Sequence, residues 1–276
     1  MHGLGRGLIF ILLALIGCAN PARAGAETTP HPAKAGAVIE YFVREPTGPR
    51  PWPTVVYLHG HQPFPSQPGG RVFADWGVLD RSAADGYLSV SVSLPGYGGS
   101  SGPADFAGPY TQAAVRAVLG KLEAEGRAAP GKVVIQGVSL GAVTGALVAA
   151  RDQRIAGLVL ISGLYDLPAF FADPKSSGAA AVKAALNRQT GGTDDALRSR
   201  SALLVASEIE AATLILNGAK DDRTDPDQAR RLADVIRGSG GQAEARIYPD
   251  FGHEIPVAAR EAEVSAFIHA TLKPHD

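Results

Sequence analysis

Short apolar runs alternate with stretches of helical spacing along most of this chain. Most of the runs are rich in Val, Ile and Leu, as in buried strands, and these span residues 54–58, 88–94, 132–136, 157–161 and 213–217. Residues 38–43 alternate like an early, partly exposed strand, and residues 243–248 are the last predicted strand. Between them, apolar residues recur at helical spacing over 71–85, 110–125, 142–151, 226–237 and 257–272. Strands that alternate with helices form parallel βαβ units, so the pattern predicts an α/β fold with a doubly wound, mostly parallel sheet.

One long segment interrupts this alternation. The stretch from Asp166 to Ala211 separates two predicted strands and is too long for a simple connection in such a sheet. It contains helical patterns of its own, so we expect residues 167–207 to form a small helical lid over the carboxyl ends of the strands. Phe170 and Phe171 are the lid residues that we expect to contact a substrate in the pocket; the alternative is that both pin the lid to the domain.

The start of the chain has the features of an export signal. Arg6 precedes the apolar run 8–16, which is too short to span a bilayer. The motif Ala-Arg-Ala at 22–24 would end a signal peptide spanning 1–24, whereas Leu-Ile-Gly-Cys at 15–18 resembles a bacterial lipobox. The lipobox would end the signal at residue 17 and place a lipid anchor on Cys18. Both routes, which the sequence leaves open, predict an exported protein that is periplasmic or secreted.

The composition of the chain after the predicted signal indicates a single folded domain. Residues 25–36 carry Pro30 and Pro32 and are predicted to be a disordered tether before a single domain over 37–276. The net charge is −1 and charged residues make up 19% without long runs, which argues against nucleic acid and against a polybasic membrane contact. Cys18 is the only cysteine, so the predicted domain has no disulfide. The sequence carries no signal for the oligomeric state.

The most informative motif lies between a predicted strand and a predicted helix. Residues 137–141 read Gly-Val-Ser-Leu-Gly and join the strand 132–136 to the helix 142–151. In that context the motif predicts a sharp turn that strains the backbone of Ser139 and turns its hydroxyl out of the sheet. Gly137 and Gly141 are needed because a Cβ at either position would collide with the neighbouring strand or helix. Ser139 is therefore the candidate nucleophile.

A serine hydroxyl needs a base within reach and a third group that orients the base. Two late loops offer these groups. His253 follows the strand 243–248 and precedes a helix, which makes it the candidate base. Asp221 and Asp222 follow the strand 213–217, and both are candidates for the acid, whereas Asp225 is better placed to cap the helix that begins at 226.

Five motifs in sequence order make the chain resemble the α/β-hydrolase superfamily. More narrowly, it is similar to the catalytic domains of the prolyl-oligopeptidase and dienelactone-hydrolase-like branches. The motifs are His-Gly at 59–60, Pro-Gly-Tyr-Gly-Gly-Ser at 95–100, the serine motif, Leu-Asn-Gly-Ala-Lys-Asp-Asp-Arg-Thr at 216–224 and Phe-Gly-His-Glu at 251–254. The resemblance extends from about Val38 to the end of the chain. It implies an α/β-hydrolase fold and a triad in the order serine, acid, histidine, with Asp221 as the acid.

Acyl transfer also requires donors for the developing oxyanion. The backbone N–H of Leu140, next to the serine, and that of His61, after the strand 54–58, are the expected donors. We expect the His59 side chain to tie this loop together. His59 and His61 have no further ligand residue close behind them, and the loop 95–102 lacks the lysine of a P-loop, so neither a metal nor a cofactor is expected.

These features predict an exported serine hydrolase that cleaves a small-molecule acyl ester through an acyl-enzyme. We expect an ester because the printed sequence holds no β-propeller region of the kind that selects peptides in true prolyl oligopeptidases. A serine peptidase or amidase acting on short peptides is the alternative within enzymes. A catalytically silent hydrolase fold used as a binding module is the alternative outside them.

Overall fold

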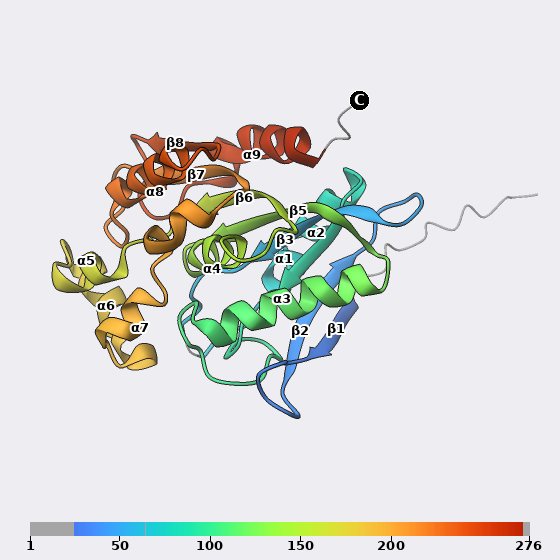
Figure 1. Cartoon of the computed structure of the whole chain (residues 1–276), viewed down its shortest axis with the longest axis horizontal. Helices are drawn as coiled ribbons and strands as arrows, with labels where there is room; N and C mark the ends of the chain where they lie inside the picture. Colours follow the sequence, from blue (N-terminus) through green and yellow to red (C-terminus); the bar gives the residue numbers. More distant parts are fainter. Residues whose placement is uncertain (1–24, 64, 273–276) are drawn as a thin grey trace, which may run out of the picture.

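The described strands form one sheet that positions every candidate site residue. The computed structural model describes residues 25–63 and 65–272. In this part of the chain the strand order is β1-β2-β4-β3-β5-β6-β7-β8 (Figure 1). β2 runs antiparallel to both of its neighbours, β1 and β4, near one edge, and the pairs from β4 to β8 in this order are parallel. The strands are β1 (Gly25–Pro30), β2 (Val38–Arg44), β3 (Trp52–Leu58), β4 (Leu88–Val92), β5 (Ala128–Val138), β6 (Ile155–Ile161), β7 (Ala212–Gly218) and β8 (Ala243–Tyr248).

Helices cover both faces of the sheet, which confirms the predicted doubly wound α/β fold (Figure 1). On one face, α3 (Pro109–Ala124), α4 (Leu140–Ala149) and α8 (Pro226–Gly238) enclose the larger core cluster. On the other face, α1 (Arg71–Asp75), α2 (Val78–Ala84) and α9 (Val257–Leu272) pack on a smaller cluster. Alternate residues of β3 serve the two clusters: Val56 and Leu58 the first, Val55 and Tyr57 the second. Apolar surface on both faces therefore fixes the central strands that end at the candidate site.

The predicted lid segment is helical. It contains α5 (Leu167–Ala172), α6 (Ser177–Thr190), α7 (Asp194–Arg198) and the 3₁₀ helix η1 (Ala202–Glu208). Side-chain oxygens of Asp166, Ser176 and Thr193 cap the first three of these helices by accepting backbone N–H groups. In Figure 1 the helices α5 to α7 form a lobe at one side of the domain.

The prediction that residues 25–36 form a disordered tether is wrong. Gly25–Pro30 is the strand β1, paired along its whole length with β2 from Gly25↔Val43 to Pro30↔Val38. His31 follows, 3% exposed, with its ring stacked on Tyr110 at 3.6 Å between centroids. Pro30 suggested disorder, but it is the last residue of the strand, where a missing N–H costs little. The stabilising partners are far away in the sequence.

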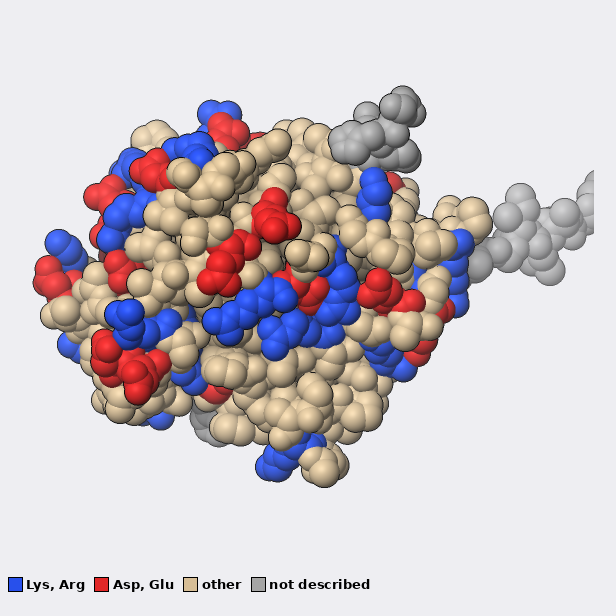
Figure 2. Space-filling view, in the orientation of Figure 1, with Lys and Arg blue, Asp and Glu red and all other residues tan. Residues whose placement is uncertain are grey.

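The helix predicted over 71–85 is interrupted. It divides into α1 and α2 at Gly77, whose φ of 66° is in the left-handed region that favours glycine. Within the described residues no helix is long and apolar enough to cross a membrane. The predicted export signal and the predicted lipid-anchor position Cys18 lie outside the described residues. Basic and acidic side chains are interspersed on the face drawn in Figure 2, so this face lacks the single-sign field that steers a polyanion.

The strand β1 is held by a cluster of charges around Arg127. The Glu27 carboxylate accepts hydrogen bonds from Tyr41 at 2.8 Å and from Arg127 at 2.9 and 3.1 Å. Burial by itself raises the pKa of Glu27, but the hydrogen bonds from Arg127 and Tyr41 outweigh it and hold this pKa below its ordinary value. The pair therefore contributes stability above the unfolded-state pKa and loses it as the pH falls through the lowered folded-state pKa.

We predict that Glu27→Gln destabilises the domain at neutral pH by about 0.5–1 kcal/mol, because the carboxylate is partly exposed. Thermal melts would register this as a decrease of roughly 1–4 °C. The gap between wild type and variant will shrink as acid protonates Glu27 in the wild type. Glu210→Gln, on an exposed side chain, is the matched control. Equal melting temperatures for wild type and Glu27→Gln at neutral pH would contradict the role given to this pair.

Candidate active site

Ser139 lies at the turn between β5 and α4 with a strained backbone. Its φ of 52° and ψ of −112° are rare for a residue other than glycine. The turn is anchored by the N–H of Ser139, which donates to the carbonyl of Ile161 at 2.7 Å. A Cβ at Gly137 would collide with the carbonyl of Gly141, and a Cβ at Gly141 would collide with that of Leu58. The predicted need for both glycines is confirmed.

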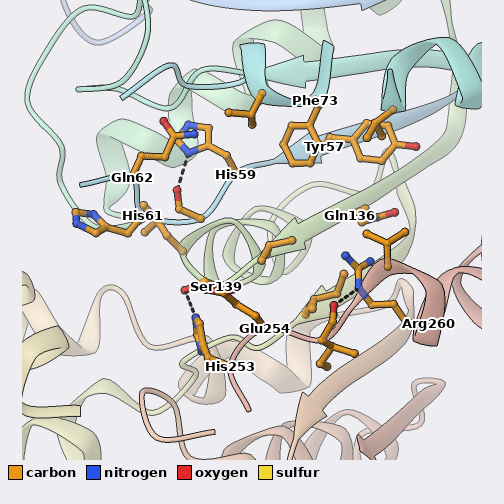
Figure 3. Close-up of a pocket in the computed structure, with 18 of the residues that line it drawn as sticks. Tyr57, His59, His61, Gln62, Phe73, Gln136, Ser139, His253, Glu254 and Arg260 are labelled. Atoms are coloured by element: carbon orange, nitrogen blue, oxygen red, sulfur yellow. Dashed lines mark hydrogen bonds between the residues drawn. The ribbon is translucent and has the colours of Figure 1, made fainter. Parts of the chain in front are cut away.

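Three side chains from three loops form one chain of hydrogen bonds. His253 Nε2 lies 3.2 Å from Ser139 Oγ (Figure 3), and His253 Nδ1 lies 2.9 Å and 3.1 Å from the two carboxylate oxygens of Asp221. Because a carboxylate only accepts, Nδ1–H donates and Nε2 is left to accept the serine proton. The structure brings the three predicted residues together in the predicted order of contact.

The other two acidic candidates do not contact His253. The backbone carbonyl of Asp222 accepts a hydrogen bond from Ser176, at the start of α6. Asp225 accepts from the N–H of Asp227 at 2.9 Å and caps α8, as its position before Pro226 predicts. Asp221 is thus the acid that contacts His253, which is the choice implied by the resemblance.

Asp221 is saturated with hydrogen bonds. Its side chain is fully buried, and its oxygens accept from Asn217 Nδ2 at 3.2 Å, Thr224 Oγ1 at 2.7 Å and the N–H groups of Arg223 and Thr224 at 2.9 Å each. Burial alone raises the pKa of Asp221, but the His253 and Thr224 bonds outweigh it and lower this pKa. The carboxylate therefore remains ionised and can stabilise a protonated His253. Sequence reasoning missed Asn217 and Thr224, although both lie within four positions of the acid.

The two predicted oxyanion donors are on segments that border Ser139. Leu140 begins α4, and the first N–H groups of a helix have no partner within the helix. A Cβ added to Gly60 would lie 3.4 Å from Ser139 Cβ, so the loop that leads to His61 passes directly beside the serine. His61 is held by a 2.8 Å hydrogen bond between its Nδ1 and the hydroxyl of Tyr97. Binding of an oxyanion by the Leu140 and His61 amides remains a prediction.

His59 ties this loop to the next strand end, as predicted. Its Nδ1–H donates to the carbonyl of Gly60 at 2.8 Å, and its Nε2 accepts from the N–H of Leu94 at 3.1 Å. Burial lowers the pKa of His59 to about 4, so the ring is neutral. In the described part of the chain no three His, Cys, Asp or Glu residues are grouped to hold a metal ion.

Ser139 opens into a large groove of about 1730 Å³. One arm lies under the lid and the other follows the sheet face between α1, α2 and α9. The lid contributes residues of α6, including Gly178, Val182 and Arg188. Sheet residues such as Val138 and helix residues such as Phe73 make much of the wall apolar (Figure 3). Such a lining suits an apolar ligand with few polar contacts.

The predicted substrate contact of Phe170 and Phe171 is wrong in this structure, because neither side chain lines the groove. Phe170 is 5% exposed and belongs to the large core cluster. Phe171 packs inside the lid, with Lys183 Nζ 4.7 Å from its ring centroid. The alternative, that both pin the lid to the domain, agrees with these positions. Position in sequence placed the lid near the site but could not reveal which of its helices faces inward.

Family models cover most of this domain. Residues 108–274 match the model of the prolyl oligopeptidase family. The chain belongs to the prolyl oligopeptidase family. Residues 35–180 also match the model of the X-Pro dipeptidyl-peptidases of the S15 family. The protein is therefore a serine hydrolase of the prolyl-oligopeptidase and S15 type, and the resemblance to the α/β-hydrolase superfamily is confirmed. No curated protein matches the sequence.

Solved structures of this family and of esterases share the fold. An acylaminoacyl peptidase from Pyrococcus horikoshii is 16% identical, with a TM-score of 0.75 over 92% of this chain and 42% of its own. A puromycin-hydrolyzing peptidase from Mycobacterium tuberculosis is 22% identical, with a TM-score of 0.73 over 98% and 44%. An acetyl xylan esterase from Paenibacillus sp. R4 is 18% identical, with a TM-score of 0.68 over 91% and 90%. The chain spans less than half the length of these two peptidases.

For this family member we predict that Asp221→Asn lowers kcat by about 10³–10⁴-fold, because an amide can hold His253 in the wrong tautomer without moving it. Steady-state hydrolysis of a p-nitrophenyl ester measures the loss. Asp222→Asn is the matched control and is expected to stay within about twofold of wild type, since only the Asp222 main chain is bonded near the site. A larger loss in Asp222→Asn than in Asp221→Asn would refute the assignment.

Proposed function

We propose that this protein is an exported serine hydrolase that cleaves a small-molecule acyl ester through an acyl-enzyme intermediate. The observation that carries the proposal is the hydrogen-bonded chain from Ser139 through His253 to Asp221, at the base of a largely apolar groove. Such a chain supplies a nucleophile, a base and an orienting acid in contact with one another.

In the acylation step, Ser139 Oγ attacks the ester carbonyl and His253 Nε2 takes the hydroxyl proton. The backbone of Leu140 and His61 donates to the oxyanion that forms. His253 then returns the proton to the leaving alkoxide, the C–O bond breaks and the alcohol departs. Asp221 stabilises the charged imidazole throughout, which its own ionised state allows.

In the deacylation step, His253 removes a proton from a water that attacks the acyl-enzyme. The second tetrahedral intermediate collapses, and His253 gives the proton back to Ser139. Water is the co-substrate, and the products are a carboxylic acid and an alcohol. Every group transfer in this scheme uses side chains and amides of the described site.

An ester is supported by the shape of the groove and by one of the neighbours. The apolar arm beside Ser139 suits an acyl chain, and the acetyl xylan esterase aligns over 90% of its own length. A serine peptidase or amidase is the second candidate. It is favoured by the prolyl oligopeptidase match and by the two peptidase structures, which cover this chain almost completely.

Export is supported by the sequence alone. Arg6 and the apolar run 8–16 form the first two parts of a signal peptide, and either cleavage at 24 or lipidation at Cys18 would follow. We propose that the mature protein is periplasmic or secreted, with a lipid anchor if the lipobox is the site that is processed.

We predict that a fluorophosphonate probe labels the wild type and that Ser139→Ala abolishes labelling without loss of fold. Matched p-nitrophenyl esters and aminoacyl-p-nitroanilides then separate the two enzyme classes. We expect ester turnover and no anilide turnover above the Ser139→Ala background, since an anilide nitrogen must be protonated to leave. Anilide turnover above that background would favour the peptidase. If the probe does not label the wild type and the wild type hydrolyses no substrate, the remaining interpretation is a binding module.

A further inference from the structure

The arm of the groove that follows the sheet face has polar groups where an apolar core is expected. Its walls come from β3, β5, α1, α2 and α9 and are largely apolar, with Val138, Phe73 and Val264 among them. The side chains of Gln136 and Arg260 line the same arm (Figure 3). A polar group in an otherwise apolar interior requires a partner.

Gln136 is the exceptional residue of β5. It faces the same side of the sheet as Val134 and Val138, two residues away on either side. Its sheet neighbours Tyr57 and Val159 are buried members of the same core cluster. Within the described residues the Gln136 amide has no hydrogen-bond partner, and it is open to the groove. An apolar residue would complete the stripe, so the amide indicates a ligand.

Arg260, on α9, places a positive charge in the same arm. The side chain is half-buried, and its Nε donates to the carbonyl of Ile255 at 3.2 Å. Among the described residues no carboxylate lies within 4.0 Å of the guanidinium, and Glu254, which also lines the groove, is instead 3.7 Å from Arg223. Burial lowers the pKa of Arg260. Glu261, the next residue on α9, acts to raise this pKa but does not offset burial. A desolvated cation with no carboxylate in contact is costly in a protein that has no anion to bind there.

We propose that Arg260 and Gln136 form an anion-binding subsite, and that the substrate is an ester whose acyl chain ends in a carboxylate. The proposal rests on the proposed function at Ser139. Gln136 precedes Ser139 by three residues, and a strand rises about 3.3 Å per residue, so the subsite lies about 10 Å from the reacting carbonyl. A guanidinium matches a carboxylate in a two-point contact, and the amide N–H of Gln136 can add a third donor.

The intervening wall fits a methylene chain. Val138 separates Gln136 from Ser139 along β5 and lines the same arm as Phe73, and apolar walls bind methylenes without selecting their number sharply. Selectivity would then come from the charge at the end of the chain. Hydrolysis adds water across the acyl–oxygen bond and releases an alcohol and a dicarboxylate.

The test compares two p-nitrophenyl esters that differ only at the far end of the acyl chain: the monoester of azelaic acid and the ester of nonanoic acid. We expect the wild type to favour the azelaic ester in kcat/KM by about tenfold or more. Arg260→Gln should erase that preference while leaving nonanoate hydrolysis near wild type, and Arg260→Lys should restore part of it. Gln136→Leu should reduce the preference by a smaller factor.

A purely structural role for Arg260, in holding the Ile255 carbonyl, would lower both rates together and leave their ratio unchanged. Arg116→Gln removes a half-buried arginine of α3 on the opposite face of the sheet and is the matched control; it should leave the ratio unaltered. A ratio that survives both Arg260→Gln and Gln136→Leu overturns the subsite, and so does a ratio near one in the wild type.

Binding separates the failure of the subsite from the failure of the proposed function. Calorimetry with Ser139→Ala should detect binding of monomethyl azelate that Arg260→Gln weakens by about tenfold or more, with the uncharged methyl nonanoate much less affected. Monomethyl azelate binding with no hydrolysis of any ester by the wild type would keep the anion subsite and reject the esterase. Ester hydrolysis with monomethyl azelate bound no better than methyl nonanoate would keep the esterase and reject the subsite.

Discussion

The site depends on three backbones that meet with no side chain between them. The end of β5, the start of α4 and the end of β3 approach so closely that Gly137 and Gly141 have no room for a Cβ. This contact forces the chain to reverse at Ser139 and leaves its φ at 52°. The strain is sustained because the strands on either side are buried on both faces. One packing constraint thereby fixes the serine and the amide of Leu140, and brings the loop to His61 alongside.

The acid and base are fixed by a different kind of interaction. Asp221 is held by short-range hydrogen bonds within its own loop and from Asn217 at the end of β7. These bonds orient the carboxylate in addition to its contact with His253, and they favour its charged form. The ends of the strands determine where each loop lies. The hydrogen bonds within the loop determine which way the side chain of Asp221 points.

The features that the sequence predicted correctly are those that residues close together in the chain determine. The alternation of strands and helices, the strained serine and the histidine after the last strand all follow from contiguous patterns. The acid was open between Asp221 and Asp222 until the resemblance decided it, because both follow the same strand. Long-range packing escaped prediction: β1 is stabilised by β2 and by Arg127 rather than by its own composition. The inward face of the lid was likewise set by how α5 and α6 pack.

The position of Gln136 suggests where substrate selection resides in this domain. The lid helix α6 presents Arg188 and Gln189 to the groove beside its small side chains, and the sheet face and α9 present an amide and a guanidinium of their own. A strand in the centre of a sheet moves less than a lid of short helices, because its hydrogen bonds and both of its faces are satisfied by neighbours. A polar contact built on β5 is therefore held at a constant distance from Ser139, which lies at the end of the same strand. The distance along β5 between Gln136 and Ser139 then sets which acyl-chain lengths can reach both. The same packing that strains the serine fixes this distance.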